Sequence, residues 1–180
     1  GNSTGNFREF FDIMEGHPHM QGGFIWDWVD QGIVRYDKNG RKFYAFGGDF
    51  GEKIHDCNFC CNGLISPERE VHPAMYEIRY LMQPMKITTC KHDKSKFTLT
   101  NRRAFTDFAD LNGSWTLTAD GVKIADGKLT GFESTKPSCK YDFAIEELDK
   151  YKSHAGELFL NFTFTLKNDT KWADAGTLIA

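Results

Sequence analysis

Four carboxylates and a tryptophan stand out in the first third of the sequence. Trp26 and Asp27 are adjacent, Asp30 follows closely, and Asp49 and Glu52 lie in a later glycine-rich stretch. Two such carboxylates can serve as the acid and the base of glycoside hydrolysis, whereas loop carboxylates are more often solvated or bound to backbone amides. An indole can stack on the apolar face of a sugar or pack in a core. Residue types alone leave these alternatives open.

A second candidate lies at residues 59–62, just before Gly63. The segment offers backbone carbonyl oxygens and the side-chain amide of Asn62. Such oxygen atoms suit a hard cation. An asparagine in a turn more often stabilises the backbone, so both interpretations stay open.

Five cysteines cannot all pair with one another, and their spacing does not resemble a disulfide framework. Cys57 and Cys60 form a C-x-x-C pair near His55, which is one half of a zinc-site pattern. No second pair follows to complete four ligands, and the other histidines form no ligand set. The sequence therefore favours reduced, partly buried thiols over zinc.

Residues 1–83 predict helices, a short strand and long loops that would position these side chains. Residues 6–15 carry apolar residues at helical spacing, with Asn6 and Glu9 as a capping box and Gly16 as the stop. Residues 24–26 predict a buried strand, and Asn39-Gly40 predicts a hairpin tip. Pro73 would begin a second helix, whose apolar face would comprise Met75, Ile78 and Met82. This order is typical of a βα repeat in an α/β barrel, where residues just beyond a strand line the active site.

From Met85 onward, apolar and polar residues alternate, as in the run from Leu158 to Leu166. Turns are predicted at Asn112-Gly113 and Asp120-Gly121. Several such strands predict an antiparallel sandwich of immunoglobulin-like size. The sequence thus predicts an α/β part over residues 1–83 and an all-β domain over residues 84–180.

Composition limits the classes of protein that fit. The 180 residues carry a formal charge of -3, with 40% hydrophobic and 14% aromatic residues. The aromatic content excludes global disorder, and the charge provides no basic footprint for nucleic acid. No apolar stretch approaches the roughly 20 residues that would span a bilayer. The chain also lacks an initial Met and stops within an apparent strand, so we expect it to be a piece of a longer protein with a truncated second domain.

Motifs along nearly the whole chain resemble the large, multidomain β-galactosidases of glycoside hydrolase family two. The string Gly22-Gly23-Phe24-Ile25-Trp26-Asp27-Trp28 is long and rare enough to be specific. The other motifs are Gly1-Asn2-Ser3 and residues 47–51, 58–60, 62–64, 72–74 and 172–176. The resemblance implies that residues 1–83 are the last part of a (β/α)8 catalytic barrel and that residues 84–180 are an immunoglobulin-like sandwich.

The resemblance also implies a retaining hydrolase of terminal β-galactosides, with one glutamate as nucleophile and another as acid/base. Only the end of the nucleophile's motif is present, as Gly1-Asn2. Both glutamates would therefore lie outside this chain, which contains no catalytic residue of the family. We expect the isolated chain to be inactive.

Three residues match binding positions of the family. Trp26 matches the aromatic platform for the galactosyl ring. Phe59, through its carbonyl, and Asn62 match ligands of a sodium ion that positions sugar hydroxyls, so Asn62 also counts as substrate-binding. The sodium site would need a carboxylate from outside the chain. The main ligands of the magnesium that the family implies would also lie outside it. The aspartates named above match no catalytic position.

The resemblance further implies a galactoside substrate, contacts with the remaining domains of the parent enzyme and a homo-oligomeric parent. Its compartment would be cytoplasmic or periplasmic. The alternative is a non-catalytic β-sandwich that binds carbohydrate or acts as a spacer. Exposed aromatic residues on one sheet face would indicate carbohydrate binding, but the residues opposite the core are mostly Thr, Asn and Lys, which favours a spacer.

Overall fold

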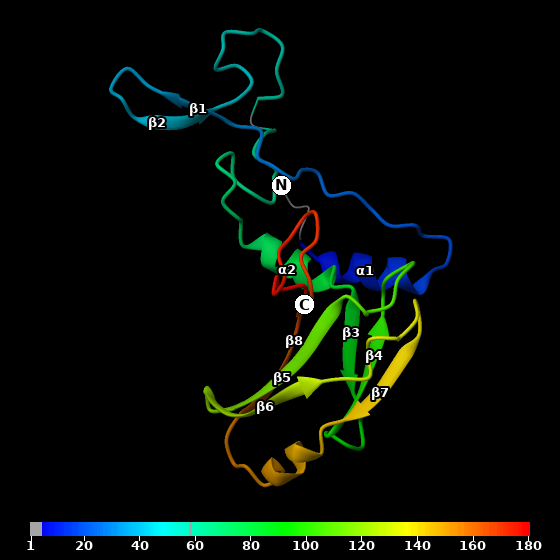
Figure 1. Ribbon diagram of the computed structural model, residues 1–180. Coiled ribbons are helices and arrows are strands. Elements are labelled where there is room, and N and C mark those ends of the chain that lie inside the picture. The colour runs from blue at the N-terminus through cyan, green and yellow to red at the C-terminus, as the bar shows by residue number, and fades with distance from the viewer. Residues whose placement is uncertain (1–4, 58) are drawn as a thin grey trace. The chain divides into compact units, whose positions relative to one another are not determined.

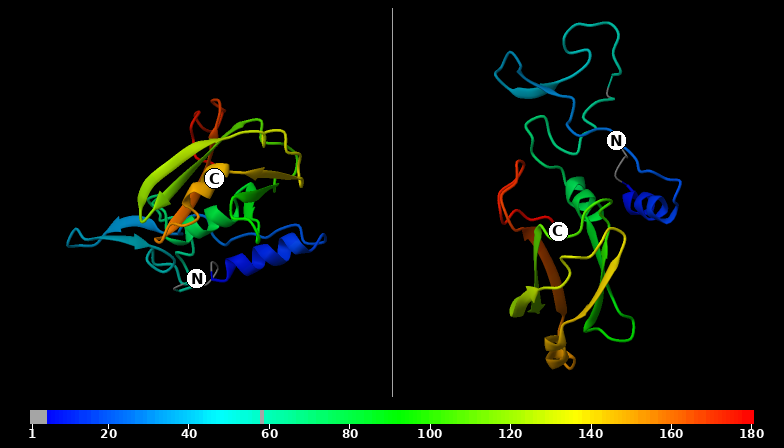
Figure 2. Two further views of the ribbon diagram at one scale, coloured as in Figure 1. Left: turned by 90° about the horizontal axis from the view of Figure 1, so that it is seen from below. Right: turned by 45° about the vertical axis from the view of Figure 1, so that its right-hand side comes forward.

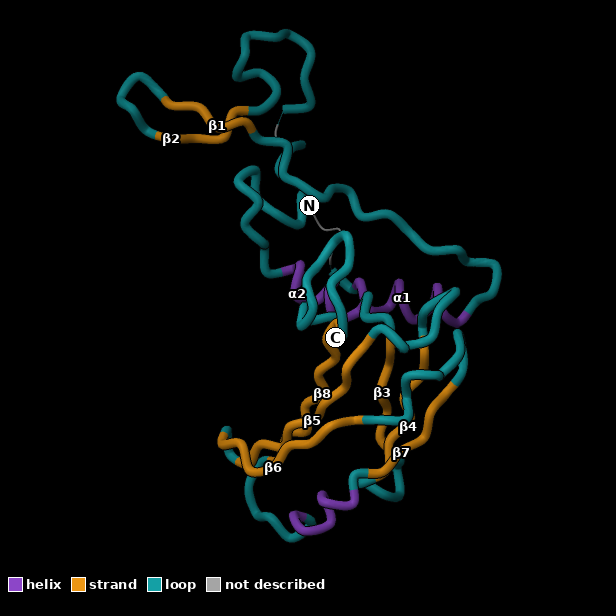
Figure 3. Tube along the Cα trace, in the orientation of Figure 1, coloured by secondary structure: helices purple, strands orange, loops and turns teal. Residues whose placement is uncertain are grey.

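The computed structural model describes residues 5–57 and 59–180 (Figure 1). The chain forms two compact units, Gly1–Met82 and Gln83–Ala180. The described part of the first unit contains two helices and one hairpin, and the second unit consists mainly of strands (Figure 3). No helix among the described residues is long and apolar enough to cross a membrane.

Helix α1 spans Phe7–Gly16 and confirms the predicted helix and its stop. The predicted capping box is wrong, because the side chain of Asn6 makes no cap hydrogen bond. Asn6 has a left-handed backbone with φ of 57°, whereas a capping side chain needs an extended backbone to reach the first free N–H groups. The Asn6 carbonyl instead accepts the N–H of Glu9 at 3.1 Å.

Strands β1 (Ile33–Tyr36) and β2 (Lys42–Ala45) form the predicted antiparallel hairpin. The Asp37 carboxylate accepts the backbone N–H groups of Asn39 and Arg41, each at 2.8 Å. Gly40 has φ of 78°, which its lack of a Cβ permits. The Asn39-Gly40 signal therefore predicted this turn correctly.

The predicted strand at residues 24–26 is wrong: these residues form no strand, and Phe24 is fully exposed. Parallel pairing begins just after them and joins residues 27–30 to residues 62–65, with a bridge between Val29 and Ile65. A barrel strand is buried only when strands flank it and helices cover it. Within the described residues, only the 62–65 segment pairs with this one.

Helix α2 spans Ala74–Leu81 and begins one residue after Pro73. It buries Ile78, as predicted, together with Leu81. Met82 does not belong to the apolar face, because the helix ends before it and its side chain is exposed.

The second unit is built from two three-stranded antiparallel sheets. One has the order β3-β4-β7 and the other the order β6-β5-β8, and the right-hand view of Figure 2 shows them facing each other. Their bounds are β3 Met85–Thr89, β4 Lys96–Asn101, β5 Leu111–Ala119, β6 Val122–Leu129, β7 Lys140–Ala144 and β8 Leu158–Leu166. A 3-10 helix, η1 (Glu146–Tyr151), links β7 to β8. Both sheets and their loops contribute to one core, whose buried members are Met85, Leu99, Phe108, Leu111, Leu129, Phe132, Phe164 and Leu166. This arrangement confirms the predicted antiparallel sheets.

One predicted turn in this unit is wrong. Asn112-Gly113 lies inside β5, while the turn at Asp120-Gly121 forms as predicted between β5 and β6. Gly113 is required by packing, because a Cβ at this position would lie 2.8 Å from the ring of Phe132. The glycine therefore makes room for a core aromatic ring inside a strand.

Candidate substrate and cation site

The parallel pairing of residues 27–30 with 62–65 ties the neighbourhood of Trp26 to Asn62. The N–H of Asp27 donates to the carbonyl of Asn62 at 3.0 Å. The N–H of Leu64 in turn donates to the carbonyl of Asp27 at 3.1 Å. Two candidate residues that are distant in sequence are thus held on neighbouring backbone segments.

Trp26 is 67% exposed and precedes a cis peptide bond to Asp27. Its indole is therefore not enclosed in a core of this unit. An exposed indole offers a large, rigid apolar face beside a polar N–H, which suits contact with a sugar ring. The structure thus keeps the sugar-stacking interpretation open.

The Asp27 carboxylate accepts hydrogen bonds from a backbone N–H and a side-chain amide, and its two partners include no carboxyl group. Its Oδ1 accepts the N–H of Trp28, and its Oδ2 accepts the side-chain N–H of Gln31 at 2.8 Å. The Gln31 Oε1 accepts the N–H of Asn62 at 3.3 Å. Gln31 therefore bridges the two segments that carry Trp26 and Asn62.

Asp30 is 8% exposed and has two close partners. Its Oδ1 accepts the N–H of Gly63 at 2.7 Å, and its Oδ2 lies 2.7 Å from Nε2 of His72. The N–H of His72 donates to the carbonyl of Leu64 at 3.0 Å. Sequence reasoning missed this pair, since it used His72 only within the motif at residues 72–74 and no spacing signal links it to Asp30.

Asp49 and Glu52 both bind the glycine-rich loop that contains them. Asp49 accepts the N–H of Phe46 at 2.9 Å, and Glu52 accepts the N–H of Gly48 at 2.7 Å. The Gly48 N–H lowers the pKa of Glu52, because the bond favours the charged carboxylate. These two carboxylates therefore shape a loop and do not form a facing acid/base pair.

The chemistry of Phe59 and Asn62 fits a sodium ion, because a backbone carbonyl and a side-chain amide supply neutral oxygen atoms. The amide nitrogen of Asn62 is buried, and its backbone is bonded to Gln31 and Asp27. Phe59 is exposed and donates its N–H to the carbonyl of Asp56 at 3.0 Å. Two such oxygens are fewer than a hard cation requires, so further ligands would have to come from elsewhere.

The cysteines of this region are all free. Within residues 5–57 and 59–180, no group of three or more His, Cys, Asp or Glu side chains is arranged to hold a metal. Cys60 is half-buried, whereas Cys57 and Cys61 are exposed, so the prediction of partly buried thiols is wrong for two of these three. The geometry gives the zinc interpretation no support.

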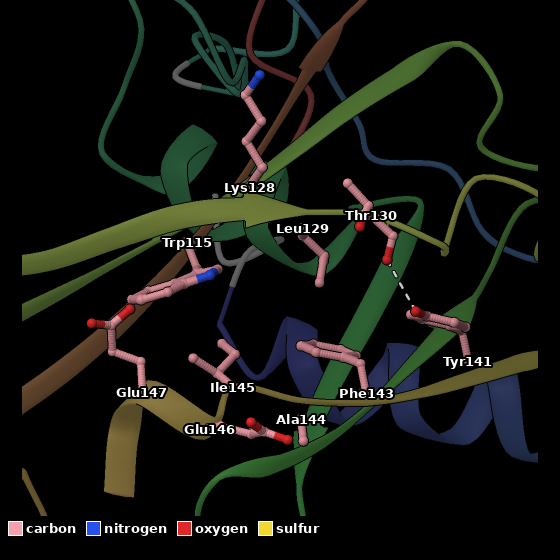
Figure 4. A pocket seen from close by; sticks show the side chains of 10 residues that line it. All are labelled: Trp115, Lys128, Leu129, Thr130, Tyr141, Phe143, Ala144, Ile145, Glu146 and Glu147. Atoms are coloured by element: carbon pink, nitrogen blue, oxygen red, sulfur yellow. Dashed lines mark hydrogen bonds between the residues drawn. The ribbon is translucent and has the colours of Figure 1, made fainter. Parts of the chain in front are cut away.

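The second unit contains a groove of about 480 Å³ between its edge strands β6 and β7 (Figure 4). Tyr141 stacks on Phe143, with ring centroids 5.9 Å apart, and donates its hydroxyl to the carbonyl of Thr130 at 3.0 Å. Trp115 is buried, and its indole lies against Gly127, where a Cβ would be 2.7 Å from Nε1. The aromatic rings of the groove are thus used in packing the sandwich.

Two family models match consecutive parts of the chain. Residues 1–87 match the TIM barrel domain of glycosyl hydrolases family 2, and residues 97–180 match domain 4 of beta-galactosidase. The chain therefore belongs to glycoside hydrolase family 2. Within that family, it is similar along its length to proteins named as β-galactosidases.

Curated relatives support this assignment. The chain is 36% identical to the β-galactosidase of Psychromonas ingrahamii over 180 residues and 36% identical to that of Photobacterium profundum over 182 residues. Identity to the β-galactosidase of Vibrio vulnificus strain YJ016 is 38% over 184 residues. Each match covers 100% of this chain and 17% of the relative. The chain thus corresponds to a small part of each of these proteins.

Proposed function

We propose that this chain is part of a retaining β-galactosidase that hydrolyses terminal, non-reducing β-D-galactosides. Residues 1–83 would be the last part of its catalytic barrel, and residues 84–180 an immunoglobulin-like sandwich. The supporting observation is similarity over the whole chain to named β-galactosidases, together with the match to the family 2 barrel. The parallel pairing of residues 27–30 with 62–65 is what adjacent barrel strands would form.

Trp26 is the proposed platform for the galactosyl ring. The indole is exposed, and the next residue, Asp27, is bonded to Asn62. A sugar on the indole would therefore lie near residues 59–62, which we call the cation loop. Stacking removes the apolar C–H face of the sugar from water at little cost in side-chain entropy. Trp26 would therefore orient the substrate without taking part in bond cleavage.

The Phe59 carbonyl and the Asn62 side-chain amide are the proposed ligands of a sodium ion in this chain. When bound, the ion would hold hydroxyl oxygens of the sugar by direct charge–dipole attraction. Asn62 would then serve both the ion and the substrate. The chain's own contribution is to fix the position of these oxygens through the backbone bonds of Asn62. Magnesium ligands would belong to other parts of the enzyme.

Retaining hydrolysis requires two carboxyl groups placed on opposite sides of the scissile bond. The carboxylates of Asp27, Asp30, Asp49 and Glu52 are bound to backbone or side-chain partners of the first unit. We therefore assign the nucleophile and the acid/base to glutamates outside this chain. The isolated chain should show no turnover, because positioning groups alone do not provide the chemical step.

The sandwich is proposed to act as a spacer between domains of an oligomeric parent enzyme. Its groove aromatics are packed against one another or against Gly127, which favours a structural role over sugar binding. The carbohydrate-binding alternative predicts heat of binding when galactose is titrated into residues 84–180 alone. A spacer predicts none.

Replacing Trp26 in the full-length enzyme tests the proposal. Trp26→Ala should lower kcat/KM for a chromogenic galactoside about tenfold or more, while Trp26→Phe should retain part of the activity, because stacking is worth about 1 kcal/mol beyond area burial. Trp172→Ala is the matched control, since Trp172 is 70% exposed but lies in the second unit. Equal kcat/KM for both alanine variants would contradict the role of Trp26, and sustained hydrolysis by the isolated chain would contradict the assignment of the catalytic pair.

A further inference from the structure

Asp30 is the most deeply buried carboxylate within residues 5–57 and 59–180. A buried carboxylate is costly unless charge and hydrogen bonds compensate for lost water. Asp30 has two hydrogen-bond partners: the N–H of Gly63 on Oδ1 and the imidazole of His72 on Oδ2. The position of the carboxylate is therefore determined from two directions.

The backbone around Gly63 lies unusually close to the segment that carries Asp30. A Cβ on Gly63 would lie 2.1 Å from the nitrogen of Asp30 and 2.4 Å from the carbonyl carbon of Val29. Only a glycine permits this approach. The Asp30 carboxylate is thus bonded to Gly63, the residue that directly follows Asn62. This bond restrains the backbone position of Asn62.

His72 extends the same connection to the start of α2. Its Nε2 meets Asp30 at 2.7 Å, while its backbone N–H donates to Leu64. One carboxylate therefore joins three segments: residues 27–31, residues 62–65 and the residue just before Pro73. Two of these segments carry the bonds through which Gln31 links Asp27 to Asn62.

We propose that Asp30 and His72 are a positioning pair that fixes Asn62 for cation and galactoside binding, an inference that rests on the proposed function. Neither side chain needs to touch the substrate. Outer partners of this kind hold a ligand in orientation, and their loss typically weakens metal binding about 10- to 100-fold. Asp30→Ala should therefore weaken sodium binding about tenfold and raise KM more than it lowers kcat.

The experiment uses the full-length enzyme with Asp30→Ala, Asp30→Asn and His72→Gln. Asn and Gln can each retain one hydrogen bond of the pair, so these variants should lose less than Asp30→Ala. Sodium binding is followed by the line width of the sodium NMR signal, and KM and kcat are measured with a chromogenic galactoside. Unfolding temperature identifies any variant that has lost its fold.

Asp120→Asn is the matched control, because Asp120 has the same kinds of partner in the second unit. It accepts the N–H of Glu157 at 2.9 Å and lies 3.3 Å from Nε2 of His154. This change should leave sodium binding and KM unaltered. A folded Asp30→Ala protein with wild-type sodium binding and KM would overturn the proposal.

Amide hydrogen exchange at residues 62–65 tests the positioning pair independently of the proposed function. If the wild-type enzyme neither binds sodium nor hydrolyses galactosides, the proposed function fails. Exchange still tests the pair in that case, because loss of Asp30 should accelerate exchange in this segment about tenfold. Unchanged exchange in folded Asp30→Ala and His72→Gln would refute the positioning role by itself.

Discussion

At the scale of single residues, short-range bonds between carboxylates and backbone N–H groups recur in both units. Asp37 binds two amides in the β1–β2 turn, and Glu52 binds the N–H of Gly48. In the second unit, Asp93 accepts the hydroxyl and the N–H of Ser95 at 2.6 and 3.1 Å. Such bonds shape turns and favour the charged form of the carboxylate.

Asp93 predicts a pH effect on the sandwich. The Ser95 hydroxyl, its backbone N–H and the Lys96 ammonium lower the pKa of Asp93 to about 2. The folded pKa lies below the unfolded value of about 3.9. The Asp93 carboxylate therefore contributes fully to the stability of the folded state above that value, and this contribution is lost as pH falls towards 2. Carboxyl NMR titration should give the low pKa, and Asp93→Asn should flatten thermal stability between about pH 4 and pH 2.

A surface carboxylate in β6 serves as the control for this titration. Asp126 is exposed and lies 3.1 Å from Lys123 in a pair three residues apart. Asp126→Asn removes a carboxylate with a similar lysine partner and is measured beside Asp93→Asn. An Asp93 titration midpoint near 4 would refute the role given to Ser95.

Gly113 predicts a steric effect at one position of the core. An alanine methyl there would meet Phe132 at 2.8 Å and Leu129 Cβ at 3.2 Å, so ring and strand must shift. Gly113→Ala should destabilise the sandwich by about 1–3 kcal/mol, as measured by urea unfolding. Gly16→Ala is the control, because nothing lies within 4 Å of its added methyl group. An equally stable Gly113→Ala protein would show that Phe132 can move aside freely.

At the scale of elements, a local turn signal predicts the turn only where no long-range contact competes with it. Asn39-Gly40 forms its hairpin, because Asp37 and the glycine satisfy the turn within a few residues. The identical dipeptide Asn112-Gly113 lies inside β5, where a long-range contact with Phe132 requires the glycine. The exposure of Phe24 likewise depends on which strands lie beside it, which the local sequence does not specify.

Helix α1 offers a test of its unusual start. Asn6 has φ of 57° and no side-chain cap bond, so Asn6→Gly should change helix stability by less than about 0.5 kcal/mol. Asn6→Ala should cost about 1 kcal/mol, because a left-handed backbone disfavours a Cβ and alanine lacks the short polar side chain that lets asparagine adopt it. Amide exchange in residues 9–13 measures both. Equal losses for the two variants would indicate that the asparagine side chain does cap the helix.

At the scale of the whole molecule, the two units differ in how much apolar surface they bury. Phe24, Trp26 and Ile54 of the first unit are largely exposed, whereas the second unit encloses a continuous aromatic and aliphatic core. Large apolar side chains that are exposed in this way are commonly covered at an interface. Under the proposed function, the rest of the catalytic barrel would cover it.

Limited proteolysis of this chain should reflect that difference. Residues 17–28 and 46–57 have few buried side chains, so we expect the first cuts there, before any cut in β4, β5 or β8. Mass spectrometry of a time course would identify a lasting product that begins near Gln83. Early cleavage within β5 or β8 would contradict this order of stability.

The candidate site was only partly accessible from the sequence. Trp26, Phe59 and Asn62 could be named because their motifs resemble a family, and their roles stay predictions. Asp30 and His72 could not be paired in advance, because the local sequence does not distinguish Asp30 from the other carboxylates nearby. The partner of Asp30 is determined by the folded structure. Long-range pairing of residues 27–30 with 62–65 carries that information.

The bond between Asp30 and Gly63 also has a consequence for chemical ageing. Asn-Gly sequences lose ammonia slowly when the glycine nitrogen attacks the asparagine side chain, and asparagine is a thermolabile residue for such reasons. At Asn62-Gly63 that nitrogen is engaged by a buried carboxylate, whereas Asn39-Gly40 lies at an exposed hairpin tip. During long storage, the tip should acquire negative charge first, while the asparagine of the cation loop keeps its amide.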